Sequence, residues 1–475
     1  MRDNLFKTFL LTLVVVAALI GMFFMPKLSF GNTELRRVNI LADVEKRDKD
    51  CRIIEYINKD SLKADNAATA DSVLNKVKRQ QKYVDDVPSG MVAIEDRIDS
   101  VSSGREMDKF YCALSCASER NVRIAYFGDS YIEGDILTQD LRHLFQERFG
   151  GKGVGFVDIM SPTAGFRQTA IQRASGWRAH NANDTKGLGF DASCQGINGR
   201  YFIPSGKASF ELKGQTRLYG TQLDTMELAT VYFTSGNGLN ISVSVNGAEH
   251  YTLFEECDTT EELHDRVMAQ SVGGHIGSFG IEVEGGQSAR FYGVALENKS
   301  GVTLDNFSMR GSNGWHISGI PYGTMRRFAQ LRPYDLIILH YGLNVASPKM
   351  SDYSYYTKRF VKTITHLKSA YPNASILVIG VGDRDAKDEY GEMHTMGGVR
   401  ELLHYQRKMA EETNVAFWSL YDAMGGDGSM ARMVEKKQAN LDYTHINFAG
   451  GKHIARLLFD VMMNGKENYE KRKGL

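Results

Sequence analysis

NVRIAYFGDS, residues 121–130, is the stretch that decides the fold expected of this chain. Its apolar residues from Val122 to Phe127 form a short run typical of a buried strand, and the run stops at Gly128. The next stretch, YIEGDILTQDLRHLFQERFG, has apolar side chains at helical spacing and ends in glycine. A strand that leads directly into a helix predicts one unit of an α/β fold.

The same pattern returns in the C-terminal half of the chain. Three further apolar runs are typical of buried strands: YDLIILHYG (334–342), ASILVIGVG (374–382) and VAFWSLYDA (415–423). Helix-like segments lie between them, around SYYTKRFVKTITHLKSA (354–370) and GVRELLHYQRKMAEET (398–413). Strands that alternate with helices predict a parallel sheet covered by helices on both faces.

Between about Gly150 and Asn306 the sequence changes to short strand-like stretches separated by Gly, Asn and Asp turns. Examples are KASFELKG, MELATVYFTS, NISVSVNG, GIEVEG and ARFYGVALEN. In NISVSVNG apolar and polar residues alternate, which is the pattern of a half-buried antiparallel strand. Several such strands predict a β-sandwich inserted into the α/β domain, and we place it at residues 195–298.

The N-terminus carries a targeting signal. From Thr8 to Met25 the chain has no charged residue, and this length is close to the roughly 20 residues that cross a bilayer core. Arg2 and Lys7 precede the apolar run and favour an N-terminus inside the cell. A cleaved signal peptide is the alternative, but no small-residue cleavage pattern ends the run. We therefore expect an uncleaved transmembrane helix, with everything after Pro26 outside the cytoplasm.

Charge and cysteine content exclude several classes of function. Lys and Arg together number 57, as do Asp and Glu, so the formal net charge is zero and no block of basic residues stands out. Nucleic acid is therefore not an expected partner, because phosphate binding needs a concentrated positive surface. The five cysteines show no Cys-x-x-Cys pair of the zinc-binding kind, so no metal site is indicated.

Gly128-Asp129-Ser130 is the first group of residues that could carry chemistry. A serine at a strand-to-helix junction projects from the carboxyl end of the sheet, where the N–H groups of the helix start favour negative charge on a substrate oxygen. The tripeptide is also a common turn, so alone it is weak evidence.

Asp442 and His445 form the second group, in LDYTHINFAGGKHIARLLFD, residues 441–460. A carboxylate three residues before a histidine can hold the imidazole while that imidazole takes a proton from a serine. The alternative is a surface loop with an incidental histidine.

Two further segments contain glycine and asparagine at positions that could supply hydrogen-bond donors. YDLIILHYGLN contains Gly342 and Asn344, and SMRGSNGWHI contains Gly311 and Gly314. Acyl transfer needs hydrogen-bond donors for the oxyanion of its tetrahedral intermediate, which an asparagine side chain and a glycine amide can supply. Each segment can also be a simple turn at a strand end.

Taken in their order along the chain, the four segments resemble the SGNH/GDSL hydrolase family over about residues 105–150 and 300–465. The resemblance implies a flavodoxin-like three-layer α/β/α fold and a serine esterase that needs no cofactor. FGDSYIEGD implies Ser130 as the nucleophile and its amide as an oxyanion donor. The Asp-x-x-His block implies that Asp442 and His445 complete the triad.

The remaining two blocks imply the other oxyanion donors. RGSNG implies the amide of Gly314, with Gly311 as the less likely register, and Gly-x-Asn implies the side chain of Asn344. The family often has aspartate after this asparagine, but here Val345 follows it. The domain boundaries that we predict are a cytoplasmic tip and anchor at 1–31, a polar stalk at 32–104, the SGNH domain at 105–194 and 299–475, and the inserted β-sandwich between its two parts.

The layout is similar to that of the bacterial peptidoglycan O-acetylesterase group, in which a β-sandwich is inserted into the SGNH domain. This resemblance implies an acetylated polysaccharide or peptidoglycan as substrate and a catalytic domain in the periplasm. One alternative is an O-acetyltransferase that uses the same serine and works beside a membrane acyltransferase partner. A non-catalytic glycan-binding protein is the other.

We expect several further polar and aromatic residues to have structural roles and no role in catalysis. We expect His340 to be packed within its strand, His316 to be satisfied in a turn, and the tryptophans to lie in the core. The charged residues 383–385 follow a strand, and we read them as a solvated loop.

Overall fold

The computed structural model describes residues 29–30, 33–34, 82–97, 104–183, 189–256 and 266–474. The predicted membrane anchor and most of the predicted stalk lie outside these residues. In the N-terminal unit, β1 (Ser29–Phe30) pairs antiparallel with β2 (Thr33–Glu34). Within the described ranges, the helices are too short or too polar to cross a membrane.

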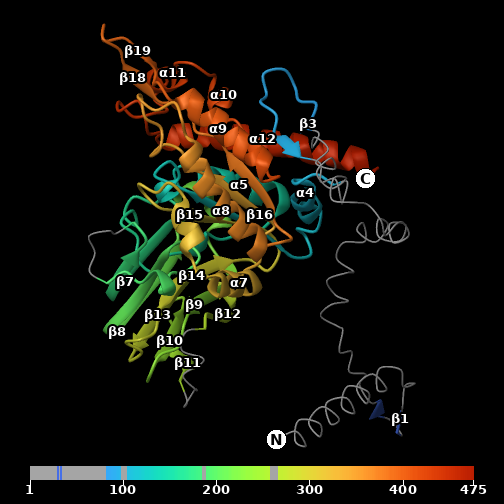
Figure 1. Ribbon diagram of the computed structural model, residues 1–475. Coiled ribbons are helices and arrows are strands. Elements are labelled where there is room, and N and C mark those ends of the chain that lie inside the picture. Colours follow the sequence, from blue (N-terminus) through green and yellow to red (C-terminus); the bar gives the residue numbers. More distant parts are fainter. Residues whose placement is uncertain are drawn as a thin grey trace, which may run out of the picture. The chain divides into compact units, whose positions relative to one another are not determined.

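A seven-stranded sheet forms the centre of the larger unit (Figure 1). Its strands lie in the order β15-β5-β16-β17-β20-β4-β3, and the first five are parallel. The parallel strands are β15 (Gly301–Ser308), β5 (Asn121–Gly128), β16 (Leu336–His340), β17 (Ser375–Ile379) and β20 (Ala416–Trp418). The prediction of a parallel sheet from the four apolar runs is therefore confirmed. β15 is not among the predicted strands, because its GVTLDNFS sequence continues the β-rich region without a break.

Helices cover both faces of this sheet and make three layers. Along β5, Ile124 and Tyr126 belong to one hydrophobic core, and Ala125 and Phe127 belong to the other, because successive side chains of a strand point to opposite faces. The first core includes residues of α4 (Asp108–Ser115), α5 (Thr138–Phe149) and α12 (Phe448–Lys473). The second includes residues of α7 (Tyr322–Leu331), α8 (Ser354–Ala370) and α9 (Val399–Glu412). The shorter helices are η1 (Glu133–Asp135), η2 (Ala192–Cys194), α6 (Thr216–Tyr219), η3 (Gly220–Gln222), η5 (Trp315–Gly319), α10 (Leu420–Met424) and α11 (Ser429–Glu435).

The predicted stalk is wrong for residues 82–97, which extend the central sheet. They form β3 (Lys82–Val84) and β4 (Glu95–Arg97), and β4 pairs antiparallel with β20. The carboxylate of Asp96 is buried and accepts hydrogen bonds from the backbone N–H groups of Glu106 and Met107, at 3.0 and 3.2 Å. The charged residues of this segment thus have partners in the folded domain, which its polar composition conceals.

The inserted β-rich part is a nine-stranded antiparallel sheet. In Figure 1 its strands lie together in the lower part of the view, below β15. It includes β6 (Gly155–Val157) and β7 (Ala170–Asn181), so the insertion begins well before residue 195, where we had predicted its start. Only two of the twelve residues of β7 are buried, and in the described part of the chain it pairs with β8 alone, so it lacks the apolar alternation of an inner strand. The other strands are β8 (Arg200–Gly214), β9 (Met226–Phe233), β10 (Asn240–Val245), β11 (Tyr251–Glu255), β12 (Met268–Ile276), β13 (Ser278–Glu284) and β14 (Phe291–Glu297).

The sheet consists of two groups of strands that share one core. In one group, β8 pairs with β7 and β13, and in the other, β14 pairs with β6 and β9. Between β14 and β8 a single residue pair, Phe291 with Phe202, joins the groups. Apolar side chains of both groups, such as Phe210 and Val231, belong to one buried cluster. Two layers of strands around a common core are the architecture of a β-sandwich.

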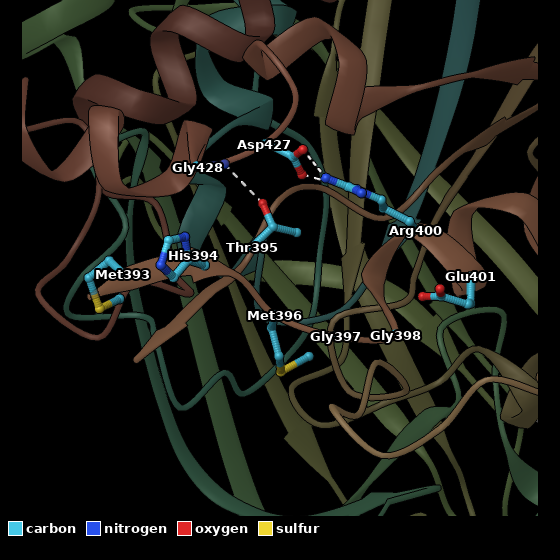
Figure 2. Close-up of a pocket in the computed structure, with 10 residues that line it drawn as sticks. All are labelled: Met393, His394, Thr395, Met396, Gly397, Gly398, Arg400, Glu401, Asp427 and Gly428. Carbon is cyan, nitrogen blue, oxygen red and sulfur yellow. Dashed lines mark hydrogen bonds and ion pairs between the residues drawn. The ribbon is translucent and has the colours of Figure 1, made fainter. Parts of the chain in front are cut away.

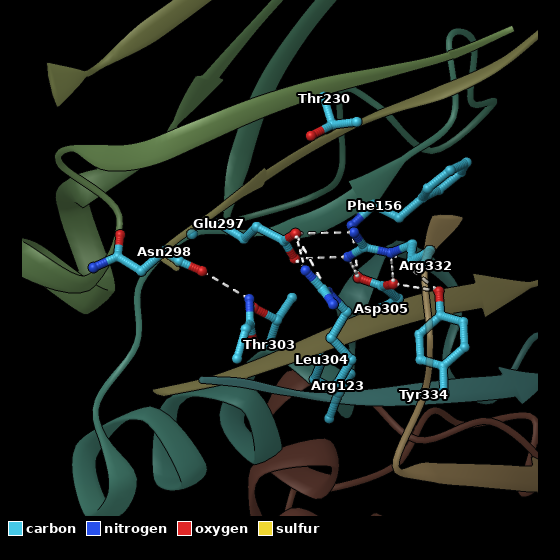
Figure 3. A network of polar contacts seen from close by, with 12 residues as sticks. Arg123, Phe156, Thr230, Glu297, Asn298, Thr303, Leu304, Asp305, Arg332 and Tyr334 are labelled. Atoms are coloured by element: carbon cyan, nitrogen blue, oxygen red, sulfur yellow. Dashed lines mark hydrogen bonds and ion pairs between the residues drawn. The ribbon is translucent and has the colours of Figure 1, made fainter. Parts of the chain in front are cut away.

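Buried charges connect the insertion to the central sheet (Figure 3). Arg332, after α7, donates to Asp305 of β15 at 2.5 and 2.8 Å and to Glu297 of β14 at 3.0 Å. These three side chains are at most 1% exposed. Arg123 of β5 also pairs with Glu297, at 2.8 Å. Burial by itself would raise the pKa of Glu297, but Arg332 and Arg123 lower it to about 2, so the carboxylate is ionised and paired.

Arg332→Met should destabilise the protein strongly. The substitution preserves most of the volume but leaves Asp305 with a buried and uncompensated charge, for which about 3–5 kcal/mol is typical. Chemical denaturation measures the loss. The control is Arg173→Ala, which removes a surface pair with Glu211 whose side chains are 78% and 51% exposed, and it should cost less than about 1 kcal/mol. Equal losses for the two variants would show that the buried network contributes little.

Candidate active site

The register of three parallel strands brings the candidate site residues to one sheet edge. Gly128, the last residue of β5, pairs with Ser308 of β15 and with His340 of β16. Ser130 follows Gly128 by two residues, and Asn344 follows His340 by four. Loops after the carboxyl ends of neighbouring parallel strands therefore converge, which is the usual place for a site in an α/β fold.

Gly128 allows the tight turn before Ser130. A Cβ atom at this position would lie 3.0 Å from the carbonyl oxygen of His340 and 3.0 Å from the side chain of Ile132. The absence of a side chain thus lets β16 and the Ser130 turn approach β5 closely. Ser130 itself is half-buried.

The structure brings Ser130, His445 and Asp442 into one hydrogen-bonded row. Ser130 Oγ lies 3.0 Å from His445 Nε2, and His445 Nδ1 lies 2.8 Å from Asp442 Oδ2. The loop between the acid and the base turns at Tyr443, whose φ is 52°, a left-handed conformation that is uncommon outside glycine. This turn lets the Asp442 carboxylate also accept the backbone N–H of His445, at 3.0 Å.

Asp442 is held in its ionised form. Partial burial by itself would raise the pKa of this carboxyl, but hydrogen bonds from the backbone and side chain of His445 and from the backbone of Thr444 lower it below its ordinary value. A carboxylate at Nδ1 orients the imidazole so that Nε2 faces Ser130, and it stabilises the imidazolium that forms when the serine proton moves. The side chains of His445 and Asp442 are 39% and 49% exposed, so substrate can reach the row from solvent.

Asn344 also lies at this edge, where Asp129 fixes its side chain. The Asn344 amide nitrogen donates to Asp129 Oδ2 at 3.2 Å and to the carbonyl oxygen of Ser312 at 3.1 Å. Asp129 also accepts the backbone N–H of Tyr131 at 3.0 Å. Burial raises the pKa of Asp129 to about 7. Asp129 belongs to the serine block of the sequence, but its role in holding Asn344 was not predicted.

The structure does not favour Gly314 as an oxyanion donor. Its amide N–H donates to Ser312 Oγ at 3.0 Å, and a Cβ atom there would lie 2.5 Å from the Phe360 side chain and 2.9 Å from that of Tyr341. Gly314 is thus packed in the interior with its N–H in use. Gly311 is the alternative register of this block. Gly311 is exposed, and in the described part of the chain neither its N–H nor that of Ser130 donates a hydrogen bond.

Two histidines near the site have structural partners. His316 Nδ1 lies 2.9 Å from Ser312 Oγ, so a side chain satisfies it, whereas we had expected the backbone of its turn. His340 is buried, as expected, with Nδ1 3.0 Å from the hydroxyl of Tyr126. Burial lowers the pKa of both to about 3, with Arg200 contributing at His316, so both stay neutral at physiological pH.

A separate pocket of about 390 Å³ lies beside the hairpin of β18 (Asp385–Lys387) and β19 (Met393–Thr395). Figure 2 shows the residues that line it, with Thr395 and Gly428 joined by a hydrogen bond of 2.9 Å. Thr395 also donates to Asp383 at 2.8 Å. Asp383 and Asp385 are 0% and 4% exposed, so our reading of residues 383–385 as a solvated loop is wrong.

One group with metal-ligand chemistry lies on the same hairpin. In the described ranges, Asp388, Glu392 and His394 place their donor atoms within 4.8 Å of one another. All three are exposed, and Asp388 already pairs with His394 at 3.1 Å. The arrangement is sufficiently explained as a surface ion pair.

Comparisons with known proteins give a clear answer for the fold. No protein-family model matches the chain, and no curated protein sequence matches it. Among solved structures, a peptidoglycan O-acetylesterase superposes with a TM-score of 0.62 and 19% identity, over 76% of this chain and 96% of the other. A family two carbohydrate esterase from Cellvibrio japonicus gives a TM-score of 0.24 and 10% identity, over 62% of this chain and 99% of the other. A GDSL-like lipase from Parabacteroides merdae gives 0.26 and 13%, over 34% and 74%.

Only the first of these superpositions is close enough to support an argument. It extends over nearly the whole of the other chain, although few residues are identical. Together with the parallel sheet and the three layers, it shows that the chain has the fold of this peptidoglycan O-acetylesterase, as expected from the resemblance of its motifs to SGNH/GDSL hydrolases.

Proposed function

We propose that the protein is a serine esterase that removes O-acetyl groups from a polysaccharide through an acyl-enzyme. The observation that carries this proposal is the row in which Ser130 Oγ lies 3.0 Å from His445 Nε2 and Asp442 lies 2.8 Å from His445 Nδ1. A serine, a base and an orienting acid at these distances are the arrangement that activates a hydroxyl for acyl transfer.

The reaction follows from the positions of these atoms. Ser130 Oγ attacks the acetyl carbonyl carbon while His445 Nε2 takes the hydroxyl proton, and Asp442 stabilises the imidazolium. When the tetrahedral intermediate collapses, the bond to the sugar oxygen breaks, and that oxygen receives the proton from His445. Water, deprotonated by His445, then attacks the acetyl-serine, so that acetate leaves and Ser130 regains its proton.

Three donors are available for the oxyanion. We assign the amide N–H groups of Ser130 and Gly311 and the side-chain amide of Asn344, so Gly311 replaces Gly314 in the set derived from the sequence. The Asn344 amide nitrogen already donates to Asp129 and to the Ser312 carbonyl oxygen, so an oxyanion beside Asn344 has to share or replace one of these two acceptors. The hydrogen bond that remains keeps the side chain in place as charge develops.

A glycan substrate is supported by one protein of similar fold and by the inserted β-rich part. That protein, at 19% identity, is a peptidoglycan O-acetylesterase, and its fold matches over 76% of this chain. We propose an acetylated polysaccharide of the cell envelope, peptidoglycan included, as the substrate class. We also propose that residues 8–25 anchor the protein, with the catalytic domain in the periplasm, because Arg2 and Lys7 precede an uncharged apolar run.

Ser130→Ala should abolish acetyl-enzyme formation. His445→Ala should be nearly as damaging, because members of a triad act as a unit, and losses of turnover on the order of 10⁴ to 10⁶ are typical. Hydrolysis of p-nitrophenyl acetate and acetate release from O-acetylated peptidoglycan measure both effects. Ser369→Ala is the control, since its hydroxyl bonds only within α8 at an exposed position. Glycan binding without hydrolysis by the unaltered protein would instead identify a binding protein, and transfer of acetyl to an added sugar would identify a transferase.

Asn344→Ala should leave the Ser130 to His445 contact intact but remove an oxyanion donor. A loss of kcat on the order of 10²–10³ is typical for such a change. Asn313→Ala is the matched control, because this neighbouring asparagine accepts a hydrogen bond from Trp315 N instead of facing Asp129. Steady-state kinetics with p-nitrophenyl acetate measures both variants. Normal kcat in Asn344→Ala would remove Asn344 from the oxyanion site.

The proposed topology predicts the activity of reporter fusions. Alkaline phosphatase fused after Leu475 should be active, because it folds only outside the cytoplasm, and a cytoplasmic reporter at the same point should be inactive. Replacing Val14, Val15 and Val16 by aspartate should reverse both results, since charges at the centre of an apolar span prevent its insertion. An active cytoplasmic reporter on the unaltered chain would refute the anchor and its orientation.

A further inference from the structure

Two phenylalanines, one of them three residues after His445, stack on each other. The rings of Phe166 and Phe448 have centroids 5.0 Å apart and planes 30° apart. Phe448 begins α12, three residues after His445. Phe166 belongs to the loop between β6 and β7 of the inserted part. The pair therefore joins the insertion to the segment that carries the catalytic histidine.

Phe166 is also in contact with the turn that follows Ser130. A Cβ atom at Gly134 would lie 2.8 Å from Phe166 Cδ1, and Gly134 has a φ of 62°. Only a residue without a side chain fits beneath the ring in this conformation. Gly134 follows Ser130 by four residues, so the ring lies between the serine turn and the histidine loop.

The ring remains open to solvent although its position is fixed. Phe166 is 53% exposed, even with Phe448 stacked against it. The next residue, Arg167, pairs with the buried carboxylate of Asp135 at 2.8 Å, and Thr169 donates to the same carboxylate at 2.5 Å. The neighbouring ion pair holds this apolar ring at the surface, where less of its area is removed from water than in a core. One face of the ring is therefore available to a ligand.

A small polar pocket of about 30 Å³, lined in part by Gly134 and Arg167, lies near the ring, so a sugar can meet its polar groups only at its mouth. The lining of the pocket comes from the central domain and from the insertion, and includes Glu133, Asp158, Ser161, Thr163, Arg200 and Ser308. Ser308 is the residue of β15 that pairs with Gly128, so the pocket reaches the edge from which Ser130 projects. An apolar face beside several hydroxyl and charged groups matches a pyranose, which has an apolar C–H face and a rim of hydroxyl groups.

We infer that Phe166, supported by Phe448, is a stacking platform for a sugar ring of the glycan chain next to the ring that carries the scissile acetyl group. This inference rests on the proposed esterase function and adds a subsite to it. The glycan lies along the seam between the inserted β-rich part and the central domain, with its hydroxyl groups toward the mouth of the polar pocket. The insertion thereby contributes directly to substrate binding through the loop between β6 and β7.

The test compares a polymer with a small ester. In Phe166→Ala, the ratio of kcat/KM for O-acetylated peptidoglycan to kcat/KM for p-nitrophenyl acetate should fall about 10-fold, mainly through KM, because the small ester has no sugar to stack. Phe166→Trp should restore the ratio. Tyr251→Ala is the control, since this exposed aromatic lies on β11 at the far edge of the antiparallel sheet. An unchanged ratio, whether both substrates lose activity or neither does, would overturn the platform.

A binding measurement separates the platform from the esterase function. Calorimetry with the Ser130→Ala protein and O-acetylated peptidoglycan fragments should show binding that weakens about 10-fold when Phe166→Ala is added. If the unaltered protein releases no acetate but this difference persists, the platform stands and the esterase proposal falls. If fragments do not bind, or bind equally with and without Phe166, the platform is refuted whatever the result for hydrolysis.

Discussion

Parallel pairing of β5 with β15 on one side and β16 on the other is the constraint on which the site depends. It sets Gly128, Ser308 and His340 side by side, so three loops that are far apart in the sequence begin at the same edge. Hydrogen bonds then join these loops: Asp129 to Asn344, and Asn344 to the carbonyl oxygen of Ser312. A slip of one residue in either pairing would turn alternate side chains to the opposite face and separate these partners.

The same strands carry the connection to the inserted part. Asp305 of β15 and Arg123 of β5 lie in one network with Glu297 and Arg332. Asp305, Glu297 and Arg332 are almost fully buried. Isolated charges could not remain there, because removal from water costs several kcal/mol per ion. Complete pairing makes the network tolerable and, since its members come from both parts, it fixes where the insertion lies relative to the sheet. The loop that contains Phe166 belongs to the insertion, so its position relative to the sheet is fixed as well.

The sequence was informative where a pattern is local and misleading where partners are distant. Apolar runs predicted four parallel strands, and motif order predicted which residues meet at Ser130. β7 and the strands within residues 82–97 escaped notice. β7 and β3 lie at sheet edges, β4 has only three residues, and the charge of Asp96 finds its partners only in the folded chain. The choice between Gly311 and Gly314 could not be made from RGSNG alone, because it depends on the packing of Phe360 and Tyr341 around the second glycine.

The solvent exposure of the triad bears on the size of substrate that suits the site. His445 and Asp442 are 39% and 49% exposed, and water around a charged pair weakens its electrostatic effect on a reacting group. A site of this kind gains most from a substrate large enough to displace that water, whereas a small ester leaves it in place. Phe166 is 53% exposed and lies against Gly134 and Phe448, and it offers apolar surface that such a substrate can cover. The openness that would be a disadvantage for a small ester is therefore consistent with action on a polymer.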